Sequence, residues 1–321
     1  MTTRREFIVR LSAGLCALAL NGACKGGTAS RRVRFGIISD VHQDLQPDAI
    51  RRLQAFVKAA QKQELDFIIQ LGDLSHGDGL DKIKAVWEQY PGKRYSVLGN
   101  HDMDHATKEI VTEALNMPGN YYSFDLAGVH FVILDLNHVR KDGKLLDYDH
   151  GNYFTAAEDR DLISPEELEW LKADLAATDK PTVFFSHQGL DELWGRGGGC
   201  PNRKDVRALI QEANLNGQKV FACFCGHNHV DAYEAIDGVH YFEINSASYF
   251  WTDASDKYSN GHMIEYKDAL FAFVTLDFDA REIKIEGTRS EFLPPAPQPG
   301  DFLNADKVYP YILDRHVQIE V

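Results

Sequence analysis

The stretch VRFGIISDVH, residues 33–42, joins an apolar run to polar residues, and the rest of the chain can be interpreted from it. Val33–Ile38 has the near-continuous apolar character of a strand that is buried on both faces. Asp40 and His42 follow at its carboxyl end. In an open α/β sheet, ligands bind outside the carboxyl ends of the strands. The stretch therefore predicts a buried strand that carries a carboxylate and an imidazole to a binding edge.

The same pattern recurs along the chain, where apolar strands end in glycine, carboxylate, amide or imidazole. Two amphipathic segments, residues 47–63 and 80–90, alternate with the first three expected strands, which predicts a parallel βαβαβ opening with both faces covered. Later strands follow one another directly, so we expect the second half to be more antiparallel. The strand-end residues are Gly72-Asp73, Gly99-Asn100-His101-Asp102, His187, and Gly226-His227-Asn228-His229.

Composition limits the classes of function. The 321 residues are 44% hydrophobic and 26% charged, which suits one large domain or two small ones. The formal net charge of −14 argues against an extended phosphate-binding surface, so no nucleic-acid partner is expected. A small anionic substrate needs concentrated positive charge, which a bound metal could supply. No run of about 20 apolar residues predicts a membrane span. Oligomeric state is not readable from these features.

Residues 1–29 are expected to be an export signal of the twin-arginine type. Arg4-Arg5 precedes Phe7 and a short apolar run, Leu11–Leu20. The alternative is an amphipathic first helix, which lacks the expected acidic face. Cys24 is a candidate lipid anchor, although Asn21 stands where such sites usually carry an apolar residue. We expect an exported protein, periplasmic or extracellular, with lipidation at Cys24 left open.

A second stretch, FACFCGHNHVDAY, residues 221–233, carries Cys223, Cys225, His227 and His229 at alternate positions. On an extended strand all four would point to one face, as in a Cys₂His₂ zinc site. Gly226, however, breaks the strand before the histidines, and the cysteines lie inside the apolar run. Free cysteine is most often a small core residue. We therefore expect the cysteines in the core and the histidines at the strand-end edge.

Taken in order, the blocks D-x-H, G-D, G-N-H-D, a lone His and G-H-x-H resemble the calcineurin-like metallophosphoesterase superfamily. Each block alone is weak, whereas five in sequence, each after an expected strand, are specific. The resemblance covers roughly residues 33–280. It implies an α/β (α+β) fold of the metallo-dependent phosphatase type, a four-layer α-β-β-α sandwich of two mixed sheets. We place the catalytic domain at residues 31–290 and a Pro-rich C-terminal strap at residues 291–321.

The resemblance also implies the site and its reaction. Two divalent ions, Mn, Fe or Zn, would share a hydroxide that attacks phosphorus in a small phosphodiester, diphosphate or nucleotide-type substrate. His101 would stabilise the leaving group and act as general acid, with Asp102 either orienting it or capping the next helix. One ion would be held by Asp40, His42, Asp73 and His229, and the other by Asp73, Asn100, His187 and His227.

Position 76 narrows the subfamily. Protein Ser/Thr phosphatases of the superfamily carry Asp there and purple acid phosphatases carry a tyrosine ligand, whereas this chain has His76. We therefore predict no tyrosinate charge-transfer colour. His76 resembles the histidine that assists catalysis in double-strand-break repair nucleases, or it only hydrogen-bonds the site. The pattern is most similar to class III cyclic-nucleotide phosphodiesterases and manganese-dependent ADP-ribose/CDP-alcohol diphosphatases, the latter also through residues 202–210.

Loops beside the expected metals must recognise the substrate. Two long loops follow expected strands beside the metals, at residues 137–154 and 187–203. The segment 245–251 follows another strand and could form the far wall of the pocket. An aromatic ring for a base and an arginine for a phosphate would make a nucleotide pocket. Alternatively, Trp194 only packs within its own loop, and Arg196 and Arg203 are solvated. Rival functions are a non-catalytic metal- or phosphate-binding protein and a nuclease. The candidate substrate residues are His150, Tyr153, Trp194, Arg196 and Arg203.

Overall fold

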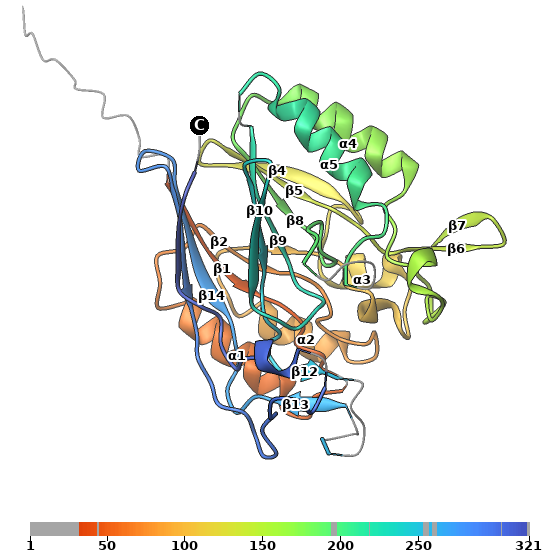
Figure 1. Ribbon diagram of the computed structural model, residues 1–321, viewed down its shortest axis with the longest axis vertical. Coiled ribbons are helices and arrows are strands. Elements are labelled where there is room, and N and C mark those ends of the chain that lie inside the picture. The colour runs from red at the N-terminus through yellow and green to blue at the C-terminus, as the bar shows by residue number, and fades with distance from the viewer. Residues whose placement is uncertain are drawn as a thin grey trace, which may run out of the picture. The chain divides into compact units, whose positions relative to one another are not determined.

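The structure is a computed structural model that describes residues 32–43, 45–193, 198–217, 219–252, 257–258, 262–302 and 304–319. The expected export signal, residues 1–29, lies outside the described residues. Residues 31–321 form one unit, whose elements are arranged in four layers (Figure 1).

Two mixed six-stranded sheets form the inner layers. In the first, β1, β2 and β3 are parallel, and β14, β15 and β16 extend the sheet antiparallel from β1. Its order is β16 (Arg315–Gln318), β15 (Glu282–Gly287), β14 (Ala272–Asp277), β1 (Arg32–Ile38), β2 (Phe67–Gln70), β3 (Lys93–Ser96). The second has the order β10 (Ala232–Ile236), β11 (Val239–Glu243), β9 (Val220–Cys225), β8 (Thr182–Phe185), β5 (Val129–Ile133), β4 (Tyr122–Leu126), with parallel strands between two antiparallel edges.

Helices cover the two outer faces (Figure 1). On the first sheet lie α1 (Ala49–Ala60), α2 (Leu80–Trp87) and α3 (Lys108–Ala114), and on the second lie α4 (Pro165–Ala177) and α5 (Arg203–Asn214). Apolar side chains fill all three interfaces, and aromatic rings dominate the central one, where Phe35 stacks on Phe67 at 4.8 Å. The four-layer sandwich and the parallel opening expected from the sequence are confirmed.

Local signals also determine single turns and caps. The hairpin between β4 and β5 turns at Ala127–Gly128, and both residues have positive φ (50° and 81°), as a two-residue hairpin of type I′ requires. The Ser164 hydroxyl caps α4 by accepting from the Glu167 amide at 3.1 Å. The run Ser164-Pro165-Glu166-Glu167 has the pattern of a capping box, which is only half formed because the Glu167 carboxylate accepts from the Asp135 amide at 2.8 Å instead.

The expected substrate loops hold local structure. Residues 137–154 contain the ribbon of β6 (His138–Lys141) and β7 (Lys144–Asp147), and β12 (Tyr249–Trp251) pairs with β13 (Met263–Glu265). Single-turn helices are η1 (His101–Met103), η2 (Ala157–Asp159) and η3 (Ala305–Lys307). The tail for which we expected a strap supplies β16, so it is also an edge strand. In the part of the chain that the structure describes, no helix combines the length and apolarity that a membrane crossing requires.

Candidate metal centre

Loops after strands of both sheets meet at one edge because they bond to one another. The His42 amide donates to the Asp73 carbonyl at 2.9 Å, which joins the loops after β1 and β2. The His227 amide donates to Asp40 Oδ2 at 3.2 Å, which joins the two sheets. The structure thereby gathers all seven predicted ligands: Asp40, His42, Asp73, Asn100, His187, His227 and His229.

The first group of donor atoms combines Asp40, His42 and His229, whose ligand atoms all lie within 4.8 Å of one another. His229 Nε2 is 3.1 Å from His42 Nε2 and 3.2 Å from Asp40 Oδ1. Asp73 Oδ2 borders this group at 3.7 Å from His42 Nε2.

The second group combines Asp73, His187 and His227. Asp73 Oδ2 is 3.1 Å from His187 Nε2. Asn100 Oδ1 completes the group at 3.1 Å from His187 Nε2 and 3.0 Å from His227 Nδ1. One carboxylate oxygen of Asp73 therefore borders both groups, which is the position of a bridging ligand.

The surroundings of these atoms fit cations. Asp40 Oδ1 is buried and accepts no hydrogen bond from any residue in the described ranges. His187 Nδ1 donates to the Leu71 carbonyl at 2.7 Å and His229 Nδ1 to the Tyr249 carbonyl at 2.8 Å, which aims the Nε2 lone pairs into the two groups. Nitrogen and oxygen ligands about 2.1 Å from one cation stand roughly 3.0–3.4 Å apart, close to the spacings within each group.

The pKa shifts of the candidate ligands also fit a site for cations. Burial lowers the pKa of His227 to about 4, so the ring is neutral, as a metal ligand must be. Burial opposes the charge of His187, but Asp73 outweighs it and raises the pKa to about 10, so a cation that binds at Nε2 would have to displace a proton there. For Asp40, burial favours the neutral acid, yet His229 lowers the pKa to about 2. Buried carboxylates here draw positive charge toward themselves.

The backbone at this edge is held in an uncommon conformation. Asp40, His42, Asp73, His227 and His229 all have φ between 50° and 70°, the left-handed region that non-glycine residues rarely adopt. Such strain persists only where surrounding contacts enforce it, and it clusters at functional sites. Five strained residues in one cluster of candidate ligands indicate that ligand placement, not local preference, shapes these loops.

Close backbone approach explains the glycine before Asn100. A Cβ atom on Gly99 would collide with the amide nitrogen and carboxylate of Asp73. The same holds for Gly226, whose Cβ would collide with Ser39 Oγ and press on the Asp40 carboxylate. The glycines of the G-N and G-H blocks thus let two strand-end loops touch the carboxylates that border the groups.

Asp104, which was not among the residues predicted from the sequence, lies beside the two groups of candidate ligands. Its carboxylate accepts from His101 Nδ1 at 2.8 Å, from His76 Nδ1 at 3.1 Å and from the Tyr153 hydroxyl. His76 Nε2 in turn lies 3.1 Å from Nδ1 of His42. Burial opposes the Asp104 charge, but the bond from His101 outweighs it, so the pKa of Asp104 lies well below its usual value.

Asp102 has neither of the roles expected for it. Its two oxygens accept from the amides of Asp73, Leu74, Ser75 and Gly99 at 2.9–3.1 Å, and α3 is capped by Thr107 instead. Burial and the neighbouring Asp73 raise the pKa of Asp102 to about 7. Asp102 therefore holds the loop of Asp73, the carboxylate that borders both groups.

The same single turn explains why Asp104 was missed. Residues three apart lie on one face of a 3₁₀ turn, so η1 brings Asp104 beside His101 and turns Asp102 inward. The i,i+3 spacing in HDMD is the signal that could have identified Asp104.

A cavity of about 490 Å³ opens over the two groups. Tyr249 and Trp251 line it, as expected for the far wall at residues 245–251, and Phe154, the last residue of the expected substrate loop 137–154, also lines it. Its described lining residues are His42, Leu45, Asp73, His76, His101, Phe154, His227, His229, Tyr249 and Trp251.

The described residues that were predicted to bind the substrate do not line this cavity. Tyr153 is buried beneath the site, where its hydroxyl receives a 3.4 Å contact from Asn100 Nδ2, so it supports the ligands and has no open face for a substrate. His150 is exposed on its loop and bonds to Asp149. Arg203 donates to Glu192 at 2.7 Å and to the Cys200 carbonyl, and neither His150 nor Arg203 lines the cavity. Trp194 and Arg196 lie outside the described residues.

Cys223 and Cys225 are free and buried in β9, and burial raises the pKa of both thiols. Cys223 packs in the core beneath α4 and α5, as expected.

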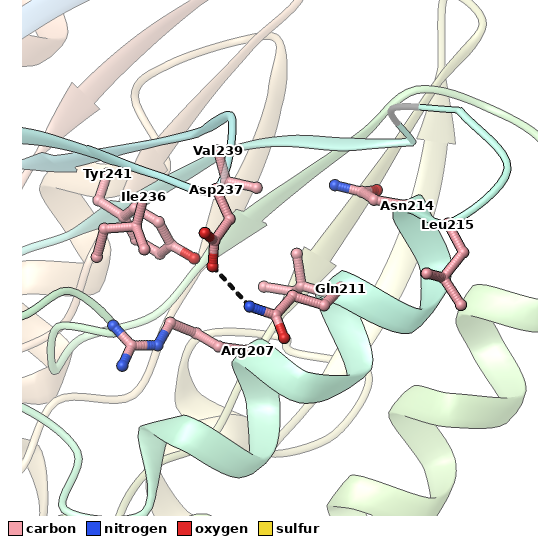
Figure 2. Close-up of a pocket in the computed structure, with 9 residues that line it drawn as sticks. Arg207, Gln211, Asn214, Leu215, Ile236, Asp237, Val239 and Tyr241 are labelled. Atoms are coloured by element: carbon pink, nitrogen blue, oxygen red, sulfur yellow. Dashed lines mark hydrogen bonds between the residues drawn. The ribbon is translucent and has the colours of Figure 1, made fainter.

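A second hollow, of about 150 Å³, lies between α5 and the β10–β11 turn (Figure 2). It contains a Gln211–Asp237 hydrogen bond of 2.6 Å and none of the candidate ligands.

A four-layer sandwich with carboxylate and imidazole groups at its strand ends is the architecture that the resemblance to metallophosphoesterases implies. The model of the calcineurin-like phosphoesterase family matches residues 33–231, more than half of the chain, and the chain belongs to this family. The chain is accordingly a member of the metallophosphoesterase class, and members of this class use divalent metals.

The chain is similar to individual proteins in sequence and in structure. The chain is 26% identical over 234 residues to purple acid phosphatase 22 of Arabidopsis thaliana, covering 65% of this chain and 46% of that protein. It thus spans less than half the length of this curated relative. A dimetal phosphatase from Danio rerio has a TM-score of 0.64 at 16% identity, covering 90% of this chain and 99% of that chain. GAP50, the anchor in the inner membrane complex of Plasmodium, has a TM-score of 0.53 at 15% identity, covering 90% of each. Structural identities this low show the fold alone.

Proposed function

We propose that this protein hydrolyses a small phosphodiester, diphosphate or nucleotide-type phosphoester at a site that holds two divalent cations. The observation that carries the proposal is the position of Asp73 Oδ2, which lies 3.1 Å from His187 Nε2 and 3.7 Å from His42 Nε2. When bound, two such ions polarise phosphoryl oxygens and supply hydroxide at neutral pH. Asp40, His42, Asp73 and His229 would hold one ion, and Asp73, Asn100, His187 and His227 the other.

In this proposal His101 gives a proton to the leaving-group oxygen. Its ring lines the cavity, its side chain is 31% exposed, and Asp104 bonds its Nδ1, which leaves Nε2 for the substrate. Burial opposes the charge of His101, but Asp73 and Asp104 outweigh it and raise the pKa. A protonated imidazole that faces the substrate is suited to general-acid catalysis.

His76 acts through the ligand His42 and not on the substrate. It also belongs to a set with His101 and Asp104 that could hold a cation. In this proposal the three residues form a hydrogen-bonded network, in which Asp104 Oδ2 accepts from both imidazoles and His76 Nε2 lies 3.1 Å from His42 Nδ1. A neighbour that bonds the free nitrogen of a metal-binding imidazole orients that ring.

The test is turnover of bis-p-nitrophenyl phosphate by protein loaded with Mn²⁺, with Fe and Zn²⁺ as alternatives. We expect hydrolysis that chelation abolishes, a rate at least 100-fold lower in His101→Ala with metal content retained, and loss of metal in Asp73→Asn. The exposed variant His105→Ala is the control.

Absence of turnover on mono- and diesters with all three metals would contradict the proposal. Metal retained without turnover would favour the non-catalytic binding protein. Faster cleavage of single-stranded DNA than of small esters, with a steep salt dependence, would favour the nuclease.

A further inference from the structure

The cavity over the metal groups is walled by rings rather than by charges. Leu45, Phe154, Tyr249 and Trp251 line it together with the imidazoles. Phe154 is 69% exposed and Trp251 is 44% exposed, although large aromatic side chains are normally covered. Exposed rings that gather at one cavity mark a binding surface.

The first wall extends outward from the first ligand group. Tyr249 is buried, and its ring centroid lies 5.2 Å from that of His42 and 5.0 Å from that of His229. Trp251 follows at 6.3 Å from Tyr249. One face of the Trp251 indole stacks on His262 at 4.9 Å with an interplanar angle of 18°. The opposite face is therefore the one that a flat ligand can cover.

The second wall stands on the side of His101. Phe154 packs on Tyr153 with ring centroids 4.6 Å apart, and the Tyr153 ring lies 6.0 Å from that of His101. The Tyr153 hydroxyl donates to Asp104, which fixes the Tyr153 ring. Phe154 therefore packs on an immobilised ring next to His101, the predicted proton donor. A ring on the substrate would find an aromatic surface on either side of the phosphorus.

The charges of the lining limit the substrate further. Among the described residues that line the cavity there is no lysine or arginine, and Asp73 is the single carboxylate. Bound cations would neutralise one phosphoryl group at the floor. Among these described residues, a second phosphate higher in the cavity would meet ring carbon and His101, the imidazole that serves the leaving group, but no guanidinium or ammonium group.

We propose that the cavity selects phosphoesters in which one phosphoryl group carries all of the negative charge and a neutral flat ring lies against Trp251 or Phe154. This proposal rests on the proposed function and names its substrate class. It favours cyclic or aryl-type esters over the diphosphates that we also considered.

The test compares two diesters of equal charge, phenyl p-nitrophenyl phosphate and methyl p-nitrophenyl phosphate, with Mn²⁺-loaded protein. Both release the same nitrophenolate and differ only in the retained group. We expect kcat/KM to be at least tenfold higher for the phenyl ester after correction for the uncatalysed rates, a factor typical of ring stacking. Trp251→Ala and Phe154→Ala should each lower kcat/KM about tenfold for the phenyl ester and by a smaller factor for the methyl ester.

Controls separate stacking from damage to the fold. Trp251→Phe should restore most of the preference. Tyr309→Ala removes a ring that is 42% exposed and does not line the cavity, so it should leave the ratio of the two esters unchanged. As a readout other than turnover, phenyl phosphate should bind Mn²⁺-loaded protein at least tenfold more tightly than methyl phosphate in calorimetric titration and should change the tryptophan fluorescence.

The outcomes are distinguishable from a failure of the proposed function. Hydrolysis of both esters with a ratio near one in the wild type and the variants would overturn this inference and leave the proposed function standing. Faster hydrolysis of diphenyl diphosphate than of the phenyl ester would overturn its charge limit. If neither ester is hydrolysed, the proposed function fails, and equal binding of the two monophosphates would then overturn the ring preference as well.

Discussion

Two aspartates two positions apart serve different partners at this site. Asp102 accepts four backbone amides and holds the loop of Asp73, whereas Asp104 accepts His101, His76 and Tyr153. Carboxylates with backbone amide donors position the main chain, and carboxylates with imidazole donors control the direction and charge of the rings. At the scale of residues, these partners predict different consequences of substitution.

Asp104→Asn should lower kcat about 10–100-fold while metal content stays near that of the wild type, because His101 loses its charged acceptor but the ligands remain. The loss should be larger for an ester with a phenol leaving group than with nitrophenol, since the poorer leaving group needs the proton more. Steady-state kinetics with both leaving groups and metal analysis measure this. Asp149→Asn, on an exposed loop, is the control, and equal losses on both substrates would remove His101 and Asp104 from proton transfer.

Gly99→Ala should reduce metal content and stability, because the new Cβ collides with the amide nitrogen and carboxylate of Asp73, which borders both groups. Overpacking of this kind costs about 1–3 kcal/mol in the free energy of unfolding. Gly119→Ala is a matched control, because a Cβ there meets only the Tyr121 carbonyl at 3.5 Å. Metal analysis and thermal unfolding of both variants test the expectation, which fails if the two behave alike.

At the scale of elements, a buried histidine between two carboxylates connects the edge strand of the second sheet to the helix that covers it. His130 in β5 lies 2.8 Å from Asp125 in β4 and 2.8 Å from Asp174 in α4, and it is buried. Burial opposes its charge, but the bonds to Asp174 and Asp125 outweigh it and raise the pKa of His130.

A histidine whose folded pKa exceeds its unfolded value of about 6.5 stabilises fully below pH 6.5 and loses this effect as pH rises through the folded pKa. His130→Asn should therefore lower the free energy of unfolding by about 1–3 kcal/mol at pH 6 and by less at pH 9. Denaturant unfolding at both pH values measures the difference. His316→Asn, at an exposed ion pair with Glu282, should show a smaller effect, and a pH-independent loss in His130→Asn would contradict the assignment.

At the scale of the whole molecule, the site depends on segments distant in sequence. Asp40 and His229 meet from different sheets, and the C-terminal β16 closes the first sheet by pairing with β15. Ile312 and Ile319 bury their side chains between the sheets. Binding at the shared edge is therefore coupled to the stability of both sheets. The export signal at residues 1–29 stays a prediction.

Removal of metal should lower the melting temperature, because ions bound only by the folded chain stabilise it by about 2.7 kcal/mol at 100 times their dissociation constant. Thermal unfolding before chelation, after it and after return of Mn²⁺ measures the effect. An unchanged melting temperature together with no detectable metal uptake would contradict the assignment of the two groups.

Iron-loaded protein should lack the tyrosinate band of purple acid phosphatases, despite the similarity to one of them, because position 76 is histidine and that ring bonds His42 and Asp104. Visible absorbance of ferric protein tests this. Appearance of the band would point to Tyr249, the lining tyrosine beside the first group.

The sequence by itself determined the α/β class, the parallel opening and the candidate ligands, because the end of each buried strand can be read locally and parallel strand ends share an edge. Only the tertiary structure decided that Asp102 accepts from the distant amide of Asp73, that Arg203 bonds Glu192 and does not line the cavity, and that Phe154 rather than Tyr153 walls it. These partners come from loops whose neighbours lie far along the chain. Contacts of that kind depend on the packing of both sheets, which no local pattern encodes.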